Sequence, residues 1–359
     1  MNSSSNTTNQ LSSCSHVKGS LVSGIRIAVQ CIILVPSLIG NSAVVAVVYR
    51  RRESRTNINC FIASMAISDL LFMLFGSLFH MIDLTNGELT WIDGAFGEFS
   101  CRFLPYLIDV TKEVSIFTMI AIAVDKFYGI LFPLKAALIN SRTRQRTICG
   151  IWTLSAITQS YQLPAWQLLP DISGSGVVCT LTLTLLLGTS TEAIKSFVVV
   201  LFILDYALPF VILLVLYTAI VLRLYHKEKA LGLVSTSLNH RETRNRKITI
   251  MFALVSFVFL AAWAPNWIWV IRYVLGDHYF DCVLRTSIQP AMQSYTLANP
   301  LIYYFFNDSF RRGFKEIFTC TCKKMKYFRT STRGWNPSSQ TRSSKMLKSE
   351  EHQVTFTRL

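Results

Sequence analysis

Long uncharged stretches alternate with short charged ones along the chain. Four intervals of 22 to 24 residues contain no Asp, Glu, Lys or Arg: 27–49, 147–170, 248–271 and 286–307. Each is long enough to cross a bilayer as a helix, which takes about 20 apolar residues. Three more intervals of similar length contain charge, and we count them as spans too: 56–82 with Asp69, 103–124 with Asp109, Lys112 and Glu113, and 196–222 with Asp205. The pattern predicts an all-α membrane protein with a seven-transmembrane helix bundle.

The composition agrees with this pattern. Of the 359 residues, 51% are apolar and only 15% are charged, with a mean hydropathy of +0.40. A soluble domain usually carries about 25% charged residues. The shortfall argues against an ordinary soluble globular enzyme.

The basic residues predict the orientation of the bundle, because cytoplasmic flanks carry the excess of Lys and Arg. Of the 35 Lys and Arg residues, 28 follow spans one, three, five and seven, six lie on the other side, and Lys112 lies inside a span. We therefore expect a multi-pass plasma-membrane protein with an extracellular N-terminus and a cytoplasmic C-terminus. The net charge of +15 then reflects topology and attraction to anionic membrane lipid, and we expect no nucleic-acid partner.

The segments outside the spans predict modification sites. Residues 1–24 form a polar extracellular tail without the features of a cleavable signal peptide, and Asn2 and Asn6 match the N-glycosylation pattern. The spans and their loops occupy 25–306. Residues 307–322 predict a short amphipathic eighth helix that ends at Cys320 and Cys322, where palmitoylation occurs.

Residues 323–359 have the composition of a disordered cytoplasmic tail. Its Ser and Thr residues are candidate acceptors for receptor kinases, and the added phosphates would recruit arrestin. Thr357 and Leu359 match a C-terminal PDZ ligand, although the match covers only three residues.

The cysteines assigned to the outer side suggest a tethered loop. One bridge can join Cys101, at the start of span three, to Cys179 in the loop before span five. Cys14 and Cys282 can form a second bridge or remain free. The residues from Val177 to Thr184 alternate with the period of a strand, so we expect a β-hairpin lid over an extracellular cavity.

Each predicted span carries a short sequence motif. The motifs are Gly40-Asn41, Met65-Ala66-Ile67-Ser68-Asp69-Leu70-Leu71, Asp125-Lys126-Phe127 with Lys126 25 residues after Cys101, Trp152, Pro209 with Tyr217, Phe259 to Pro265, and Asn299-Pro300-Leu301-Ile302-Tyr303. Together these motifs resemble those of rhodopsin-like (class A) G-protein-coupled receptors, and most closely those of the neuropeptide-receptor branch. The resemblance covers about residues 25–320. It implies a signalling receptor that binds an extracellular ligand and activates heterotrimeric G proteins, and it implies neither catalytic residues nor a required cofactor.

The resemblance also implies an activation network around Asp69. Its members would be Asn41, Asp69, Ser115, Tyr217, Trp263, Thr296, Asn299 and Tyr303. An allosteric sodium ion at Asp69 would stabilise the inactive bundle. A protonated Asp69 in a polar packing network is an alternative, and Trp263 fits either an activation switch or simple aromatic packing.

One departure from the family pattern concerns the G-protein surface. Lys126 stands where the family usually has arginine, so the charge that pairs with Asp125 is kept but the planar fork is lost. The chain can still couple, or it can be a decoy or arrestin-biased receptor. The expected coupling residues are Asp125, Lys126, Pro133, Leu134, Arg246 and Lys247.

The ligand class is narrowed by exclusion. Gln293 stands where opsins have the retinal lysine, and Ile108 where amine receptors have an Asp, so light sensing and monoamines are disfavoured. A peptide ligand fits better, with a small non-peptide ligand as the alternative. The expected ligand-binding residues are Asp109, Lys112, Glu113, Asp205, Trp263, Trp267 and Gln293.

The charges inside spans three and five allow two interpretations, because buried charges need partners. In one, Lys112 pairs with Asp109 or Asp205, and Glu113 is protonated or bonded to a neighbouring helix. In the other, one acid stays free to meet a basic group of a cationic peptide.

A membrane transporter is the alternative from a different class, but the chain shows no repeated halves. An enzyme would need a nucleophile or metal constellation, and none is evident in the sequence.

Overall fold

The computed structural model describes residues 20–51, 56–86, 90–132, 141–171, 176–230, 240–276 and 282–319. Several predicted sites lie outside these residues: Asn2, Asn6, Cys14, Pro133, Leu134, Cys320, Cys322, Thr357 and Leu359.

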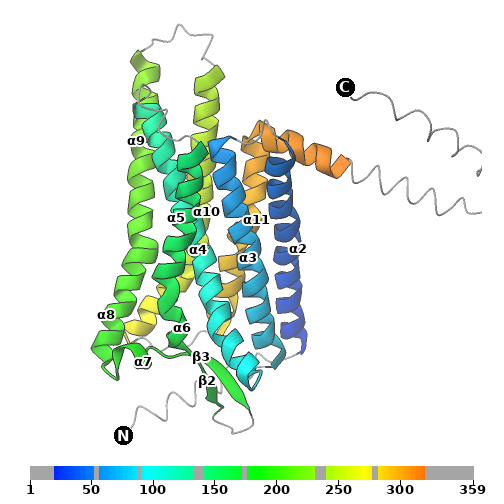
Figure 1. The fold of residues 1–359 in the computed structure, drawn as a ribbon, viewed down its shortest axis with the longest axis vertical. Coiled ribbons are helices and arrows are strands. Elements are labelled where there is room, and N and C mark those ends of the chain that lie inside the picture. Colours follow the sequence, from blue (N-terminus) through cyan, green and yellow to red (C-terminus); the bar gives the residue numbers. More distant parts are fainter. Residues whose placement is uncertain are drawn as a thin grey trace, which may run out of the picture. The chain divides into compact units, whose positions relative to one another are not determined.

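Seven helical columns stand side by side in the described part of the chain (Figure 1). The first three are α2 (Ser20–Arg50), α3 (Asn57–Asn86) and α4 (Ala95–Leu131). The fourth is α5 (Ser141–Thr158), continued by the 3₁₀ turn η4 (Gln159–Tyr161) and α6 (Gln162–Ala165). The last three are α8 (Thr191–Phe202) with the π-helical turn η5 (Ile203–Ala207) and α9 (Leu208–Ala230), α10 (His240–Val274), and α11 (Cys282–Phe306).

Helix α4 is the centre of this arrangement. It contacts α3, α5, α9 and α10, and it also contacts η4 and α6. A side chain on α4 can therefore reach groups from most of the other columns, which is why the charged residues of this helix meet partners from distant parts of the sequence.

The apolar pattern predicted these columns with one error at an end. Among the described residues, five helical stretches are long and apolar enough to cross a membrane, and α5 and α11 are not among them: the five are Gly24–Arg50, Asn57–His80, Ala95–Leu131, Thr191–His226 and Arg246–Arg272. The prediction of a helical span over residues 147–170 was wrong beyond Ala165, because residues Trp166–Pro170 form strand β2. An uncharged stretch reports burial or pairing without distinguishing a helix end from a strand.

A small sheet lies at one end of the bundle. Strand β2 (Trp166–Pro170) pairs antiparallel with β3 (Val177–Leu181), and β1 (Thr90–Trp91) pairs with the other edge of β3. The strand predicted to reach Thr184 ends at Leu181, because its partner Trp166 is the first residue of β2. Thr184 instead begins the short helix α7 (Thr184–Leu187).

A disulfide between Cys101 and Cys179 ties β3 to α4, and this confirms the predicted bridge. Trp91 packs in the same buried cluster. Its indole nitrogen donates hydrogen bonds to the Gly97 carbonyl at 2.9 Å and to the Ser100 hydroxyl at 3.0 Å.

Residues 308–319 are helical after α11. Phe310 and Phe314 are buried and lie 5.8 and 6.2 Å, between ring centroids, from Tyr303 and Tyr304. Gly313 lets the same segment pack closely on Val47 of α2, since a β-carbon at this position would lie 2.5 Å from a methyl group of Val47.

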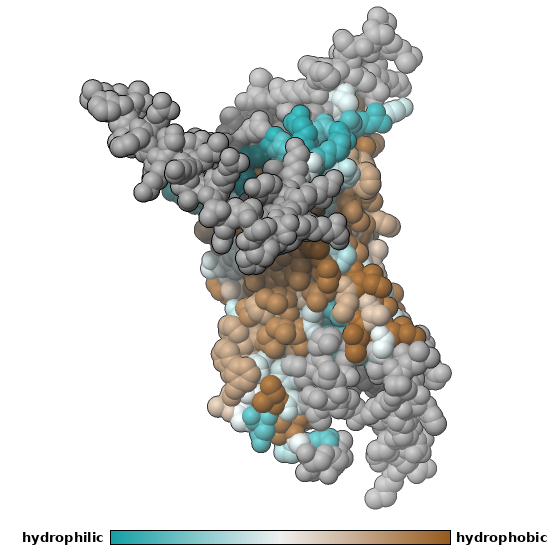
Figure 2. Space-filling view, turned by 90° about the vertical axis from the view of Figure 1, so that its right-hand side faces the viewer, coloured by the Kyte–Doolittle hydropathy of each residue, from teal (hydrophilic) through white to brown (hydrophobic). Residues whose placement is uncertain are grey.

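The described part of the bundle exposes large apolar side chains on its outside and buries polar and charged side chains among the apolar ones of its interior. Figure 2 shows hydrophobic residues across the middle of the visible face. Large apolar side chains such as Ile32, Leu214 and Phe257 are exposed, whereas Asp69 and Lys112 are buried. This distribution is that of a multi-pass membrane protein, whose intramembrane charged groups face the bundle interior and are functional by default.

Candidate functional site

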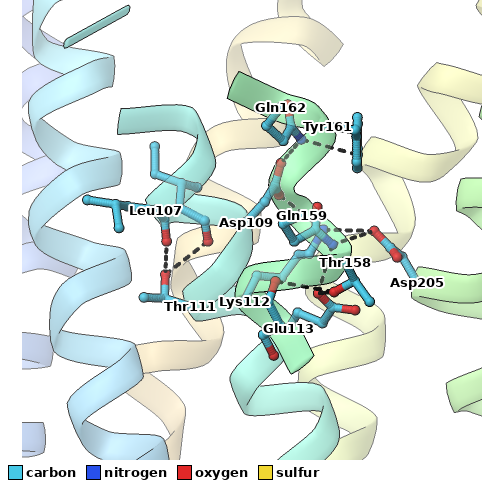
Figure 3. A network of polar contacts seen from close by, with 12 residues as sticks. Leu107, Asp109, Thr111, Lys112, Glu113, Thr158, Gln159, Tyr161, Gln162 and Asp205 are labelled. Carbon is cyan, nitrogen blue, oxygen red and sulfur yellow. Dashed lines mark hydrogen bonds and ion pairs between the residues drawn. The ribbon is translucent and has the colours of Figure 1, made fainter. Parts of the chain in front are cut away.

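A cluster of charged side chains lies between α4, η5 and the fourth column (Figure 3). The Lys112 ammonium is 3.0 Å from Asp109 Oδ1 and 3.2 Å from Asp205 Oδ2. Asp109 and Lys112 are neighbours on α4 because residues three apart share a helix face. Asp205 reaches them from the π-helical turn, a feature that often re-aims side chains at functional sites. We call Asp109, Lys112, Glu113 and Asp205 the Lys112 cluster.

Glu113 is held by the fourth column. Its Oε2 accepts hydrogen bonds from the Thr158 hydroxyl at 2.5 Å and from Gln159 Nε2 at 3.0 Å. Gln159 Nε2 also lies 3.5 Å from Asp205 Oδ2. Lys112 is therefore paired with both aspartates, and Glu113 is hydrogen-bonded to a neighbouring helix. This agrees with the interpretation in which the buried charges are paired within the bundle.

A chain of hydrogen bonds links the cluster to the sheet. The indole nitrogen of Trp166, the first residue of β2, donates to Gln162 Oε1 at 2.8 Å. Gln162 Nε2 in turn donates to Asp109 Oδ2. Since β2 pairs with the strand that carries the disulfide, Asp109 is connected to the tethered hairpin.

The neutral partners in the fourth column were missed by sequence reasoning. Thr158, Gln159, Tyr161 and Gln162 lie in an interval that was noted only for lacking charge. The available signal was the run of hydrogen-bonding side chains in an otherwise apolar span, because such groups need buried partners.

Trp263 on α10 lies beside Lys112. The Lys112 ammonium is 5.2 Å from the centre of the Trp263 ring, within range of a cation–π interaction. The ring centroids of Phe72 and Phe259 are each 6.0 Å from that of Trp263. Phe259 and Phe72 also contact Tyr295 of α11. We call Phe72, Phe259, Trp263 and Tyr295 the aromatic cluster.

Two predicted ligand-binding residues lie apart from these groups in the described contacts. Trp267 packs against the rings of Phe202 and Tyr206, at 5.5 and 6.3 Å between centroids. Gln293 accepts a hydrogen bond at 2.6 Å from Gln30, which also donates to Ser77. The structure thus brings four of the seven predicted ligand residues into one charged cluster, adds Trp263 at its edge, and leaves Trp267 and Gln293 in separate contacts.

Asp69 has neutral partners. Its two oxygens accept hydrogen bonds from the Ser115 hydroxyl at 3.2 Å and from Asn299 Nδ2 at 2.9 Å. The hydroxyls of Ser68 and Ser115 are 2.8 Å apart. We call Asp69, Ser68, Ser115 and Asn299 the Asp69 network.

The other members predicted for this network lie around it. Asn41 Nδ2 donates to the Thr296 carbonyl at 2.9 Å, and together these residues join α2 to α11. Tyr217 and Tyr303 are buried on α9 and α11. Trp263 belongs to the aromatic cluster, and none of its described contacts is with Asp69.

The donor set around Asp69 fits a sodium ion. Asp69 and Ser115 offer buried oxygens, and Asn299 Oδ1 is buried without a hydrogen-bond partner among the described residues. Oxygen ligands with a carboxylate are what hard cations prefer. The residues present can therefore hold such an ion.

Of the predicted coupling residues, Asp125 and Lys126 lie at the opposite end of α4 from the disulfide. Lys126 Nζ is 3.9 Å from Asp125 Oδ2, with 13% and 22% of the two side chains exposed. Arg246 and Lys247 are exposed on α10.

The sequence matches the family described as 7 transmembrane receptor (rhodopsin family) over residues 40–303. It is 28% identical over 297 residues to galanin receptor 2b of Danio rerio, across 80% of this chain and 72% of that receptor. It is 27% identical to the substance-P receptor of Homo sapiens, across 82% and 70% of the two chains. For the tachykinin-like peptides receptor 86C of Drosophila melanogaster, the identity is 26%, across 80% of this chain and 57% of that receptor.

Proposed function

Because this chain belongs to the rhodopsin family of seven-transmembrane receptors, we propose that it is a plasma-membrane receptor that binds an extracellular peptide and activates heterotrimeric G proteins. Receptors of this family are not enzymes. The observation that carries the proposal is the Lys112 cluster, a buried charged site that is hydrogen-bonded through Gln162 and Trp166 to a disulfide-tethered hairpin.

A cationic peptide is the ligand that the charges of this site favour. The cluster contains three acids and one base. Of the two aspartates that pair with Lys112, Asp109 has the more exposed side chain, at 22% against 9% for Asp205. Three relatives are named as receptors for galanin, tachykinin-like peptides and substance P, which supports a peptide over a small non-peptide ligand.

The orientation of the proposed receptor follows from its basic residues. With 28 of 35 Lys and Arg on one side, the hairpin end faces outward, and the end with Lys126, Arg246 and Lys247 faces the cytoplasm. Glycosylation at Asn2 and Asn6, palmitoylation at Cys320 and Cys322, a PDZ partner at Thr357 and Leu359, and arrestin with receptor kinases on the tail belong to the same proposal.

Coupling to G proteins depends on the cytoplasmic end of α4. Lys126 keeps an ion pair with Asp125, but an ammonium lacks the planar fork of a guanidinium, so contact with a G protein is weaker than an arginine would give. The second candidate function, a decoy or arrestin-biased receptor, is favoured by this one substitution.

We also propose that a sodium ion binds at Asp69, held by Asp69 and Ser115 with the side-chain amide oxygen of Asn299, Oδ1, nearby. When bound, the ion would supply a positive charge that holds α3, α4 and α11 together in the inactive arrangement. Without it, the hydrogen bonds from Ser115 and Asn299 keep the carboxylate in place.

The test is expression of the full chain with sensors for each G-protein class, against a library of basic and neutral peptides. We expect a ligand-evoked signal from a basic peptide, and a stronger one in the Lys126→Arg variant. Lys195→Gln, which changes an exposed basic residue paired with Glu192, is the matched control. Binding without any G-protein signal, restored by Lys126→Arg, would establish the decoy function instead.

A further inference from the structure

The Lys112 cluster carries more acid than base. Asp109, Glu113 and Asp205 face one another around Lys112, which is the single basic partner in the contacts that these acids make among the described residues. Charges interact more strongly inside a protein than in water. A second cation would therefore find excess negative charge in this site.

The three acids are held in different ways. Glu113 is bonded to Thr158 and Gln159, two neutral donors that a ligand cation cannot replace by charge alone. Asp109 and Asp205 owe their compensation to one shared ammonium, on a long side chain that is only 6% exposed. An entering cation can therefore form ion pairs with Asp109 and Asp205 while Glu113 keeps its hydrogen bonds.

Lys112 has a second contact that binding would alter. Its ammonium lies 5.2 Å from the centre of the Trp263 ring, and that ring packs on Phe72 and Phe259. On α4, Ser115 lies three residues after Lys112 and bonds to Asp69. A movement of Lys112 would therefore change its contact with the aromatic cluster. Helix α4 also links the two sites, because it carries both Lys112 and Ser115, a partner of Asp69.

We propose that Asp109 and Asp205 form a cation-exchange site in which a guanidinium or ammonium group of the ligand replaces the Lys112 ammonium, and that the displaced Lys112 transmits binding to Trp263. The inference deepens the proposed function and rests on it for the identity of the ligand as a peptide. It names the basic group as the part of the ligand that the site recognises, and Lys112 as a positioning residue.

The exchange is tested on the purified full chain in lipid nanodiscs with n-butylguanidinium, and with n-butylurea as the neutral probe of similar shape. We expect the cation to raise the Tm by about 2 °C or more, because a ligand that binds only the folded state stabilises it. The urea should have no effect. The rise should disappear in Asp109→Asn and in Asp205→Asn, and persist in Glu98→Gln, which removes an exposed acid of α4 paired with Arg102.

Transmission is tested by ¹⁹F NMR of protein labelled with 5-fluorotryptophan, with the Trp263 resonance assigned by Trp263→Phe. We expect n-butylguanidinium to shift this resonance in the wild type and not in Asp109→Asn.

Equal responses to the two probes, including no response to either, would overturn the exchange site. A rise in Tm with an unmoved Trp263 resonance would overturn the role of Lys112. Neither readout uses a G protein, so a receptor that fails to signal in cells leaves both tests standing.

A Lys112→Ala variant gives a second measurement in which the probe replaces the missing side chain. We expect n-butylammonium to restore its Tm toward that of the wild type, and n-butanol not to do so. Rescue by the alcohol alone would show that the lost methylene packing matters and the charge does not, which contradicts an exchange of cations.

Discussion

Two buried acidic sites to which α4 contributes side chains differ in what compensates their charge. In the Lys112 cluster, the charges of Asp109 and Asp205 are compensated by one shared ammonium, and Gln162 and Gln159 add one neutral donor to each. In the Asp69 network, a single carboxylate is held by two neutral donors, Ser115 and Asn299. A charge that is paired with a charge fails when its partner is removed, whereas a charge held by neutral donors loses only part of its support. The first site therefore suits a charged ligand and the second a small ion.

The two sites also differ in access. Asp69 is fully buried between α3, α4 and α11. The Asp109 side chain is 22% exposed and lies two turns along α4 from the disulfide that holds the hairpin. The difference supports the proposals that the Lys112 cluster recognises the ligand and that the Asp69 network holds the ion.

The largest effect is expected from Lys112→Met, which keeps an unbranched side chain one heavy atom shorter and removes the charge. The variant leaves two acids without their cation, and breaking a buried ion pair costs about 3–5 kcal/mol. Thermal unfolding of purified protein in nanodiscs measures the loss. The triple variant Asp109→Asn, Lys112→Met and Asp205→Asn removes all three charges and should recover most of the stability. A triple variant no more stable than Lys112→Met would show that packing at Lys112 decides the effect.

A smaller effect separates the two aspartates. Asp205→Asn removes the acid that joins η5 to α4, so it should cost about 1.5–3 kcal/mol, the range for hydrogen bonds to charged groups. Asp109→Asn should cost less, because this side chain is more exposed and keeps its bond from Gln162. The two Tm values, measured side by side, give the order. An equal or reversed order would mean that exposure of Asp109 does not weaken its pair with Lys112.

The contacts of the Asp69 network were predicted from the sequence more completely than those of the Lys112 cluster. Asp69 and its partners Ser115 and Asn299 were predicted from the family resemblance, and the structure brings the three together. The contact between Lys112 and Asp109 could be anticipated because residues three apart on a helix are neighbours. Which of the two aspartates Lys112 would meet was left open, and it pairs with both.

What could not be predicted depends on the ends and irregularities of helices. The donors to Glu113 and Asp109 come from Thr158, Gln159 and Gln162, where the fourth column changes from α-helix to 3₁₀ turn. Asp205 lies in a π-helical turn, which changes the direction of a side chain without leaving a mark in the apolar pattern. The hydropathy pattern predicted the helical columns, but the polar contacts of the Lys112 cluster depend on these local changes in helical twist.

Sodium dependence should distinguish the inner network from the outer cluster. If sodium binds at Asp69, its presence at about five times the dissociation constant stabilises the fold by about 1 kcal/mol. We expect a higher Tm in sodium chloride than in choline chloride at equal ionic strength for the wild type, and no difference for Asp69→Asn. Asp205→Asn should keep the difference. Loss of the sodium effect in Asp205→Asn, or its retention in Asp69→Asn, would place the ion outside the Asp69 network.

The smallest effect is expected from Ser68→Ala, which removes a neutral partner at one remove from the charge. The Ser68 hydroxyl bonds to Ser115, which itself bonds to Asp69, so the carboxylate keeps both of its direct donors. Loss of one such bond costs about 0.5–1.5 kcal/mol. Ser294→Ala is the matched control, since that hydroxyl bonds to the Ala291 carbonyl of its own helix. A fall in Tm for Ser68→Ala as large as that for Lys112→Met would show that neutral and ionic compensation are equally fragile here, and the contrast between the two sites would not hold.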